Sequence, residues 1–450
     1  MADQARPATC SGTHPTADPL ASPAPHRAAG PAGPARPADA PPRGRARRVP
    51  AVSAPRTAGT GGTLTLGARA AGAARSRTGG ATRVVVMVWA CTRALLAAVL
   101  LHTVRANGTT AARALGNWDV QHYLAIAVGG YADQLSMAFF PGVPLVMRAL
   151  AQLGLPAVEA TAAVCALASL VAALAMDRLG GQWAAIAWLL APMAVFTVVG
   201  YSEALFCAFG LWAWVLARRG RWWWASLAAA FACTTRISGV FLVGGLILLA
   251  LTGGEPTAPG AAPCTRTTGP RDRLRHAAIA ALPLLVVVAF FAHLHDITGA
   301  WDAWFTAQRA GWDRSWTNPW QSFQNTLFAV DPAAWPEEPT RAWIFRFEIA
   351  SVVIGLVTVL VALARRAWAQ AGYVLVQLLA LTTATWFMSV NRGDLLWFPL
   401  FIGIGRLVAH RPDSKGADLL RSVVLLLVVL ADLVLMAWWA RLFFLGHWAS

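Results

Sequence analysis

The chain has 450 residues, of which 57% are hydrophobic and only 13% are charged, and it carries a formal net charge of +16. Soluble globular proteins are usually about 45–50% apolar and about 25% charged. The composition therefore excludes a disordered, collagen-like or small disulfide-stapled protein and points to a membrane protein. Twenty-two Trp residues agree with this, because Trp concentrates at membrane–water interfaces.

Residues 1–83 differ from the rest of the chain. They are rich in Ala, Pro, Arg and Gly, show no hydrophobic period, and hold twelve Arg against three Asp. Such a segment buries too little apolar surface to offset its ordering entropy, so we expect a disordered, basic cytoplasmic tail near anionic lipid rather than a nucleic-acid-binding arm. The apolar run that starts at Val84 comes too late for a signal peptide, and Met87 is an alternative start of the protein.

A helix that crosses a bilayer needs about 20 predominantly apolar residues. Eleven apolar runs approach this length, at 84–104, 157–176, 182–200, 203–217, 222–235, 237–251, 277–294, 346–364, 371–388, 395–410 and 422–440. The segment 138–153 carries two prolines and Arg148, so we expect it to be re-entrant or interfacial. The sequence predicts an all-α, polytopic transmembrane bundle of about 11 spans over residues 84–450.

The charges between these runs predict the topology. Basic clusters around Arg219, Arg273, Arg366 and Arg411 mark the cytoplasmic side of short loops, and eleven spans threaded from a cytoplasmic N-terminus place all four clusters inside. The extracytoplasmic face of the cell membrane then receives the remaining connections, at 105–156, 201–202, 236, 295–345, 389–394 and 441–450. We therefore look for the chemistry on these segments.

The first extracytoplasmic segment contains GNWDVQHYLAIAVGGY at 116–131. Its apolar positions form a rough face made of Trp118, Tyr123, Ile126 and Val128. This pattern predicts a short helix that lies at the membrane surface. Asp119 stands at the start of that helix, where it is either a helix cap or a general base that takes a proton from a sugar hydroxyl.

Other charged residues lie at the ends of spans. Glu203 is either a solvated charge favoured by the helix dipole or part of the site. A charge deep in a membrane costs about 2.5–3.5 kcal/mol on insertion scales, so Arg236 and Arg392 should face a polar cavity, where they either bind phosphate or pair with Glu203. Arg93 is expected to be structural and paired within the bundle.

The second large extracytoplasmic segment, 295–345, holds seven Trp among Asp302, Gln308, Arg309, Asp313 and Arg314. Aromatic planes stack on sugar faces and also anchor proteins at interfaces, and the sequence leaves both readings open. The first loop has no DxD pair, and the six Cys residues form no CxxC pair. We therefore expect no metal site and no other cofactor.

These segments resemble the PIG-V-type mannosyltransferases of the GT-C glycosyltransferase superfamily, in their bacterial branch. The resemblance rests on WDVQHYLAIAVGGY followed by FFPGVP (139–144), and on YSEALF (201–206), ACTTRISG (232–239), AQRAGWDR (307–314) and SVNRGDLLWFPLF (389–401). Two departures stand out. Gly142 and Val143 replace a Leu-Tyr pair that is usual in the family, and Gly393 replaces a Tyr.

The resemblance implies an integral membrane hexosyltransferase. It would transfer mannose from polyprenyl-phosphate mannose to an envelope glycan or glycolipid, with inversion of the anomeric configuration. Asp119 would be the catalytic base, and Arg236 and Arg392 would bind the donor phosphate. The candidate substrate-binding residues are Trp118, His122, Tyr123, Glu203, Gln308, Trp312 and Arg314. The alternatives are a polytopic lipid or solute transporter, or a catalytically degenerate glycosyltransferase-like protein.

Overall fold

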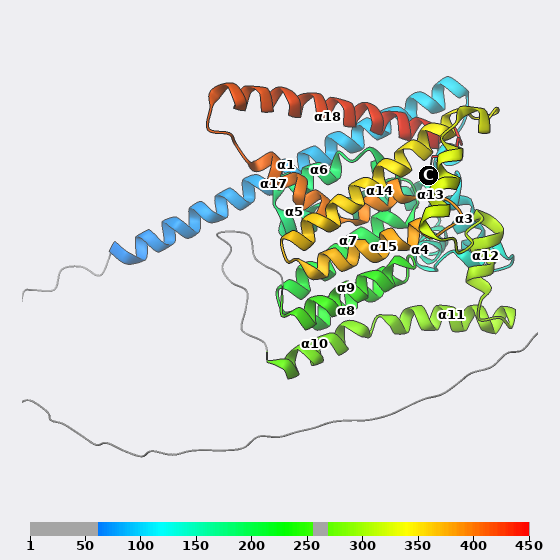
Figure 1. The fold of residues 1–450 in the computed structure, drawn as a ribbon, viewed down its shortest axis with the longest axis horizontal. Helices are drawn as coiled ribbons and strands as arrows, with labels where there is room; N and C mark the ends of the chain where they lie inside the picture. Colours follow the sequence, from blue (N-terminus) through cyan, green and yellow to red (C-terminus); the bar gives the residue numbers. More distant parts are fainter. Residues whose placement is uncertain (1–61, 255–268, 450) are drawn as a thin grey trace, which may run out of the picture. The chain divides into compact units, whose positions relative to one another are not determined.

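Long apolar helices form the frame of the computed structural model (Figure 1). The structure describes residues 62–254 and 269–449. Within these residues, five segments are long and apolar enough to cross a membrane. They are α1 (Gly62–Asn107), α5 (Ala157–Gly180), α10 and α11 together (Pro270–Ala281 and Leu284–Thr298), α14 (Thr340–Ala364) and α18 (Lys415–Phe444). Exposed Leu and Val side chains cover the first two-thirds of α18, as expected for a surface that faces lipid.

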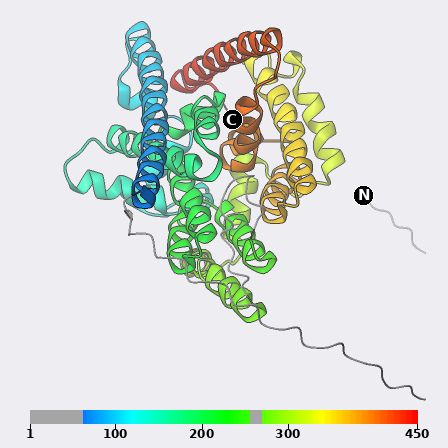
Figure 2. The same cartoon turned by 90° about the vertical axis from the view of Figure 1, so that its left-hand side faces the viewer.

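Shorter helices fill the space between these segments. They are α6 (Gln182–Leu189), α7 (Ser202–Arg218), α8 (Trp222–Cys233), α9 (Ser238–Thr252), α15 (Trp368–Thr382) and α17 (Phe398–Ala409). α5 packs on α7, α7 on α8, α15 on both α9 and α14, and α17 on α6. Figure 2 places α1 and α14 on opposite sides of this bundle. The described part of the chain contains helices and no strand, so the predicted all-helical membrane fold is confirmed.

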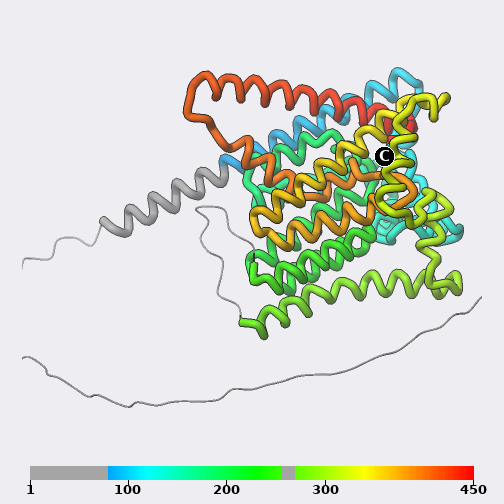
Figure 3. Tube along the Cα trace, in the orientation of Figure 1, coloured from blue at the N-terminus to red at the C-terminus, as the bar shows by residue number. Residues whose placement is uncertain are grey.

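Short helices gather at one end of the bundle. They are α2 (Ala111–Leu115), α3 (Asp119–Gly129), η1 (Leu135–Ala138), α4 (Gly142–Gln152), η2 (Pro192–Thr197), α12 (Ala303–Trp312), α13 (Pro319–Ala329), η3 (Pro332–Ala334), α16 (Val390–Gly393) and η4 (Asp394–Leu396). Figure 3 shows segments from the cyan, yellow-green and red parts of the chain meeting there. All but η2 and most of η4, which fall in the predicted spans 182–200 and 395–410, belong to the loops that the charge pattern assigned to one face.

The structure differs from the predicted elements in several places. The run 182–200 is not one helix, because Pro192 separates α6 from η2. α1 begins at Gly62, ahead of the predicted boundary at 83, while the rest of the predicted tail lies outside the described residues. Several apolar helices are shorter than 18 residues, so the count of about 11 spans is not confirmed.

Two smaller predictions also change. The buried face of α3 consists of Val120, Tyr123, Ile126 and Ala127, whereas Val128 is 80% exposed. A helix period of 3.6 residues accounts for this, because it turns Val128 away from the face that Val120 and Tyr123 share. Arg93 is held within the bundle as expected, but by hydroxyls. Its Nη1 donates to Ser169 Oγ at 3.2 Å and to Thr197 Oγ1 at 2.6 Å.

Candidate active site

A tight turn leads the chain into α3 and sets the direction of Asp119. The amide of Val120 donates to the carbonyl of Asn117 at 3.3 Å. Trp118 between them has φ 57° and ψ −125°, a conformation that glycine favours at the second position of a type II′ turn. Asp119 is the first residue of α3, and its carboxylate accepts a hydrogen bond from Arg392 rather than capping the helix.

Two carboxylates and two guanidinium groups meet beside this turn. Glu203, near the start of α7, is 1% exposed, and its Oε1 lies 2.6 Å from Arg236 Nη1 and 3.1 Å from Arg392 Nε. Arg392 Nη1 lies 3.1 Å from Asp119 Oδ2. A charged group within a membrane protein needs a partner of opposite charge or a polar cavity. The buried pair with Glu203 that the sequence left open is therefore present for both arginines.

Aromatic rings surround the Arg392 guanidinium. Its central carbon lies 5.1 Å from the ring centroid of Tyr201 and 5.5 Å from that of Phe196, within the range of a cation–π interaction. The backbone N–H of Asp119 in turn donates to the hydroxyl of Tyr201 at 3.3 Å. Tyr201 thus links the start of α3 to the arginine that pairs with Asp119.

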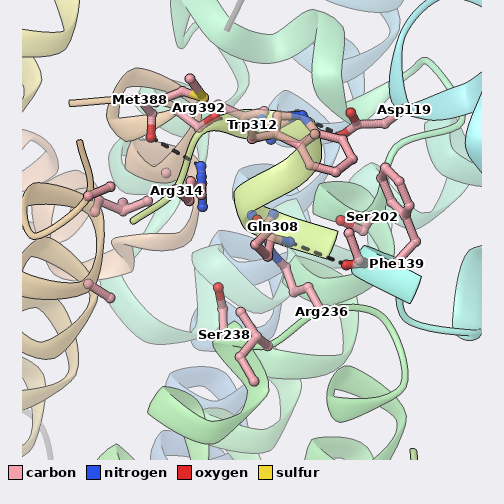
Figure 4. Close-up of a pocket in the computed structure, with 18 of the residues that line it drawn as sticks. Asp119, Phe139, Ser202, Arg236, Ser238, Gln308, Trp312, Arg314, Met388 and Arg392 are labelled. Atoms are coloured by element: carbon pink, nitrogen blue, oxygen red, sulfur yellow. Dashed lines mark hydrogen bonds and ion pairs between the residues drawn. The ribbon is translucent and has the colours of Figure 1, made fainter. Parts of the chain in front are cut away.

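A cavity of about 920 Å³ borders the charge cluster. Figure 4 shows side chains from α3, α12 and the segment before α16 pointing into it. Eight of the ten predicted site residues line this cavity, namely Trp118, Asp119, Tyr123, Arg236, Gln308, Trp312, Arg314 and Arg392. Such a volume is within the usual range for small-molecule sites.

Arg314 adds a third cation to the cavity wall. Its Nη2 donates to the carbonyl of Met388 at 3.4 Å, and its buried Nε has no hydrogen-bond partner. Burial, together with repulsion from Arg392 and Arg236, lowers the pKa of Arg314 to about 10, so the group stays protonated at neutral pH. Among the described residues, the ion pairs of this cluster involve Arg236 and Arg392 and leave Arg314 without a carboxylate in pairing distance.

Tyr123 does not compete with Asp119 for the role of a base. Burial, aided by the negative charges of Asp119 and Glu203, raises the pKa of Tyr123 well above its ordinary value. The phenol therefore stays protonated at neutral pH.

The part of the chain that the structure describes contains no group of three or more His, Cys, Asp or Glu side chains placed to hold a metal ion.

Comparison with known proteins connects this geometry to a family. Residues 104–253 match the family model described as Mannosyltransferase (PIG-V). Over 152 residues, 30% of this chain, the sequence is 35% identical to the GPI alpha-1,6-mannosyltransferase 2 of Homo sapiens and 34% identical to that of Rattus norvegicus. Residues 104–253 of the chain are therefore similar to the PIG-V-type mannosyltransferases.

The likeness to these PIG-V relatives has a limited extent. The aligned part covers 31% of the length of each curated relative, and no solved structure matches the chain. The segment that matches the family model contains Asp119, Glu203 and Arg236 but not Arg392. The structure nevertheless brings Arg392 into ion-pair distance of Asp119 and Glu203.

Two of the ten predicted residues do not line the cavity. Glu203 lies beneath its surface, where it pairs with the two arginines. His122 lies to one side, and its ring stacks on Phe139 at 4.8 Å and meets Trp312 at 5.8 Å. His122 thus packs against two residues that line the cavity wall, and it does not line the cavity itself.

The Trp residues of segment 295–345 fall into two groups. Trp304 and Trp335 donate to the carbonyls of Ala138 and Ala329, at 3.1 and 2.9 Å, so their indoles are tied to the protein. Trp316, in contrast, is 83% exposed and still borders the cavity. This residue is free to meet either a sugar face or the bilayer interface.

The sequence analysis missed Glu348, which is fully buried in α14. Its carboxylate accepts the backbone N–H groups of Ser389, Val390 and Asn391 at 2.9, 2.6 and 3.2 Å. It therefore fixes the short α16 that carries Arg392. The signal was available, because a lone carboxylate inside an apolar run such as 346–364 is a functional candidate by default.

Gly142, where this chain departs from the usual PIG-V pattern, lies against the segment that carries Arg236. Its N–H donates to the carbonyl of Thr234 at 2.7 Å, and a Cβ at this position would lie 2.7 Å from Thr234 Oγ1 and 2.8 Å from Thr234 O. The start of α4 can thus approach the α8–α9 connection only because residue 142 has no side chain.

We expect Gly142→Ala to lower both thermal stability and activity, since the clash forces Thr234 and its neighbour Arg236 to move. Overpacking of this kind typically costs about 1–3 kcal/mol, measurable as a lower melting temperature in detergent. The matched control is Gly244→Ala in α9, where an added Cβ meets nothing within 4 Å. An unchanged melting temperature for Gly142→Ala would show that this contact is loose.

Proposed function

We propose that the protein is an integral membrane mannosyltransferase that transfers mannose, with inversion, from a polyprenyl-phosphate donor to an envelope glycan or glycolipid. The observation that carries this proposal is the pairing of Asp119 with Arg392 at 3.1 Å on the wall of a large cavity. This arrangement places a carboxylate that can accept a proton next to a cation that can hold a phosphate.

Asp119 acts as the general base. Its carboxylate lines the cavity, where it can accept the proton of the acceptor hydroxyl. The hydroxyl oxygen then forms a bond to the anomeric carbon of mannose, and the bond from that carbon to the phosphate oxygen breaks. The electron pair leaves with polyprenyl phosphate, and attack from the opposite face inverts the anomeric configuration.

During this step Arg392 changes its partner from the carboxylate of Asp119 to the phosphate of the donor. The phosphodiester of the donor gains one negative charge when it becomes a phosphomonoester, while Asp119 loses its charge as it is protonated. Arg392 is bonded to Asp119 beforehand and is released toward the phosphate as that carboxylate becomes neutral. Fixed cations placed where charge develops lower the barrier most, and Arg236 and Arg314 on the same wall add to this effect.

The cavity also has an apolar part beside Arg236. Phe140, Ile237 and Phe241 line it, which suits the first prenyl units of a lipid donor better than a free nucleotide sugar. The exposed Trp316, which also borders the cavity, suits the acceptor sugar. In this arrangement the donor approaches from the bilayer and the acceptor from the aqueous side.

The decisive experiment uses purified full-length protein in nanodiscs with polyprenyl-phosphate mannose and a crude extract of envelope glycolipids as acceptor. Release of polyprenyl phosphate and mannosylation of a glycolipid are the expected results. Movement of the donor lipid between leaflets without release of polyprenyl phosphate would favour the transporter alternative. Binding of the donor with neither outcome would identify a degenerate enzyme.

We further propose that the N-terminus is cytoplasmic and that the active site lies on the extracytoplasmic face. In a background without native Cys, Asp313→Cys should react with an impermeant maleimide in intact cells, because this residue is exposed at the site end of the bundle. Arg219→Cys, exposed after α7, should react only after permeabilisation. Labelling of position 219 in intact cells would reverse the topology.

A further inference from the structure

We infer that residues 446–449, here named the C-terminal strap, hold the turn before α3 in place and thereby orient Asp119. This inference rests on the proposed function, because it assigns a positioning role for the proposed base. It starts from Trp118, whose φ of 57° is unusual for a residue with a side chain. Such a conformation is strained and persists only where neighbouring structure imposes it.

Contacts from the end of the chain hold this turn from two sides. The indole N–H of Trp118 donates to the carbonyl of His447 at 3.0 Å. The side-chain amide of Asn117 donates to the carbonyl of Phe443, in the last turn of α18, at 2.9 Å. The two residues that precede Asp119 are thus bonded to backbone more than 300 positions later in the chain.

The strap is itself anchored, so it can transmit this constraint. The indole N–H of Trp439 in α18 donates to the carbonyl of Ala449 at 2.7 Å. His447 Nδ1 lies 3.1 Å from Glu338 Oε1, and Glu338 also pairs with Arg341. The strap is therefore fixed both to α18 and to the segment that leads into α14.

The strap also forms part of the cavity wall. Trp448 and Ala449 line the same cavity as Asp119, and the ring of Trp448 lies 5.1 Å from that of Phe345. Phe443, at the end of α18, meets the ring of Tyr201 at 5.5 Å. Since the hydroxyl of Tyr201 accepts the N–H of Asp119, α18 reaches the proposed base by a second route.

Trp118→Phe tests the inference, because it keeps an aromatic ring in the wall and removes the N–H donor; the smaller size of the phenyl ring is matched by the control. We expect kcat to fall about 10–10²-fold, the scale on which a displacement of about 1 Å acts, while the KM for polyprenyl-phosphate mannose stays within about twofold. The matched control is Trp212→Phe, which removes an indole–carbonyl hydrogen bond of 3.1 Å to Val171 far from the cavity and should leave kcat unchanged.

A second variant lacks residues 446–450. It should show the same loss of kcat. A variant that combines Trp118→Phe with the truncation should be no worse than the truncation alone, because both changes remove the same hydrogen bond, from Trp118 to His447. Hydrogen exchange of the backbone amides at 117–122 should become faster in both variants and stay unchanged in Trp212→Phe. This readout requires no turnover, so it remains valid if a variant is inactive.

Several results would overturn the inference. Unchanged amide exchange in both variants would show that the strap does not hold the turn. Faster exchange with normal kcat would show that the turn need not be held for catalysis, and a loss confined to KM would make Trp118 a substrate contact instead. Absence of mannosyl transfer by the unmodified protein would refute the proposed function, and the exchange data would then alone decide whether the strap constrains the turn.

Discussion

Asp119→Asn is expected to reduce mannosyl transfer by about 10²–10⁴-fold, the usual contribution of a general base. The amide has the size of the carboxylate but cannot accept the acceptor proton. Turnover of polyprenyl-phosphate mannose by purified protein is the measurement. The donor should still bind, because the arginines that we assign to its phosphate remain in place.

The structure supplies a control for this substitution. Asp418→Asn also removes a carboxylate from an ion pair, the one with Arg421 at 3.4 Å, but in α18 away from the cavity. It should retain full activity. If Asp119→Asn kept most of its turnover, the base would be another group, and Glu203, which already faces two arginines, would be examined next.

Arg392→Lys is expected to lower turnover by about 10²–10³-fold, the scale on which the loss of one charge-stabilising donor acts. Arg392 uses separate nitrogens, Nη1 for Asp119 and Nε for Glu203. A Lys ammonium carries the same charge but lacks the planar fork that serves two partners at once. The protein should still fold, because one cation has replaced another.

Arg236 provides the comparison within the same site. It contacts Glu203 through Nη1 alone, a role that Lys can fill, so Arg236→Lys tests whether this guanidinium also binds phosphate. Arg236→Met and Arg392→Met should instead lower thermal stability, since each removes one partner of a buried carboxylate. Turnover and melting temperature are measured together. A Lys variant that is normal in both would remove that arginine from the proposed site.

Hydrophobic runs and loop charges predicted much of the architecture. Each apolar run corresponds to one helix or to consecutive helices, because a segment in lipid has to satisfy its backbone hydrogen bonds internally. Charge asymmetry placed Asp119, Arg236 and Arg392 on one face, and the structure brings their segments together at one end of the bundle. The run at 182–200 was wrongly predicted to be one helix, because Pro192 interrupts an otherwise continuous apolar stretch.

The partners of each charge were not predictable in the same way. The sequence offered Glu203 as a partner for either arginine, but sharing between both depends on how α7, the α8–α9 connection and α16 pack. The partners of Glu348 and those of the C-terminal strap were unpredictable for the same reason. Both act on backbone groups of distant segments, and such contacts leave no local pattern in the sequence.

The shared carboxylate of Glu203 has a consequence for biosynthesis. Arg392 follows Asp119 by 273 positions. At a synthesis rate of about 5–20 residues per second, Arg392 is therefore synthesised roughly 15–55 s after Asp119. Arg236 follows Glu203 by only 33 positions. Arg236 can therefore neutralise Glu203 while α7, α8 and α9 enter the bilayer, long before the second half of the protein exists. Arg392 then joins a carboxylate that is already in place, and the Glu203–Arg236 pair serves the nascent chain as well as the finished one.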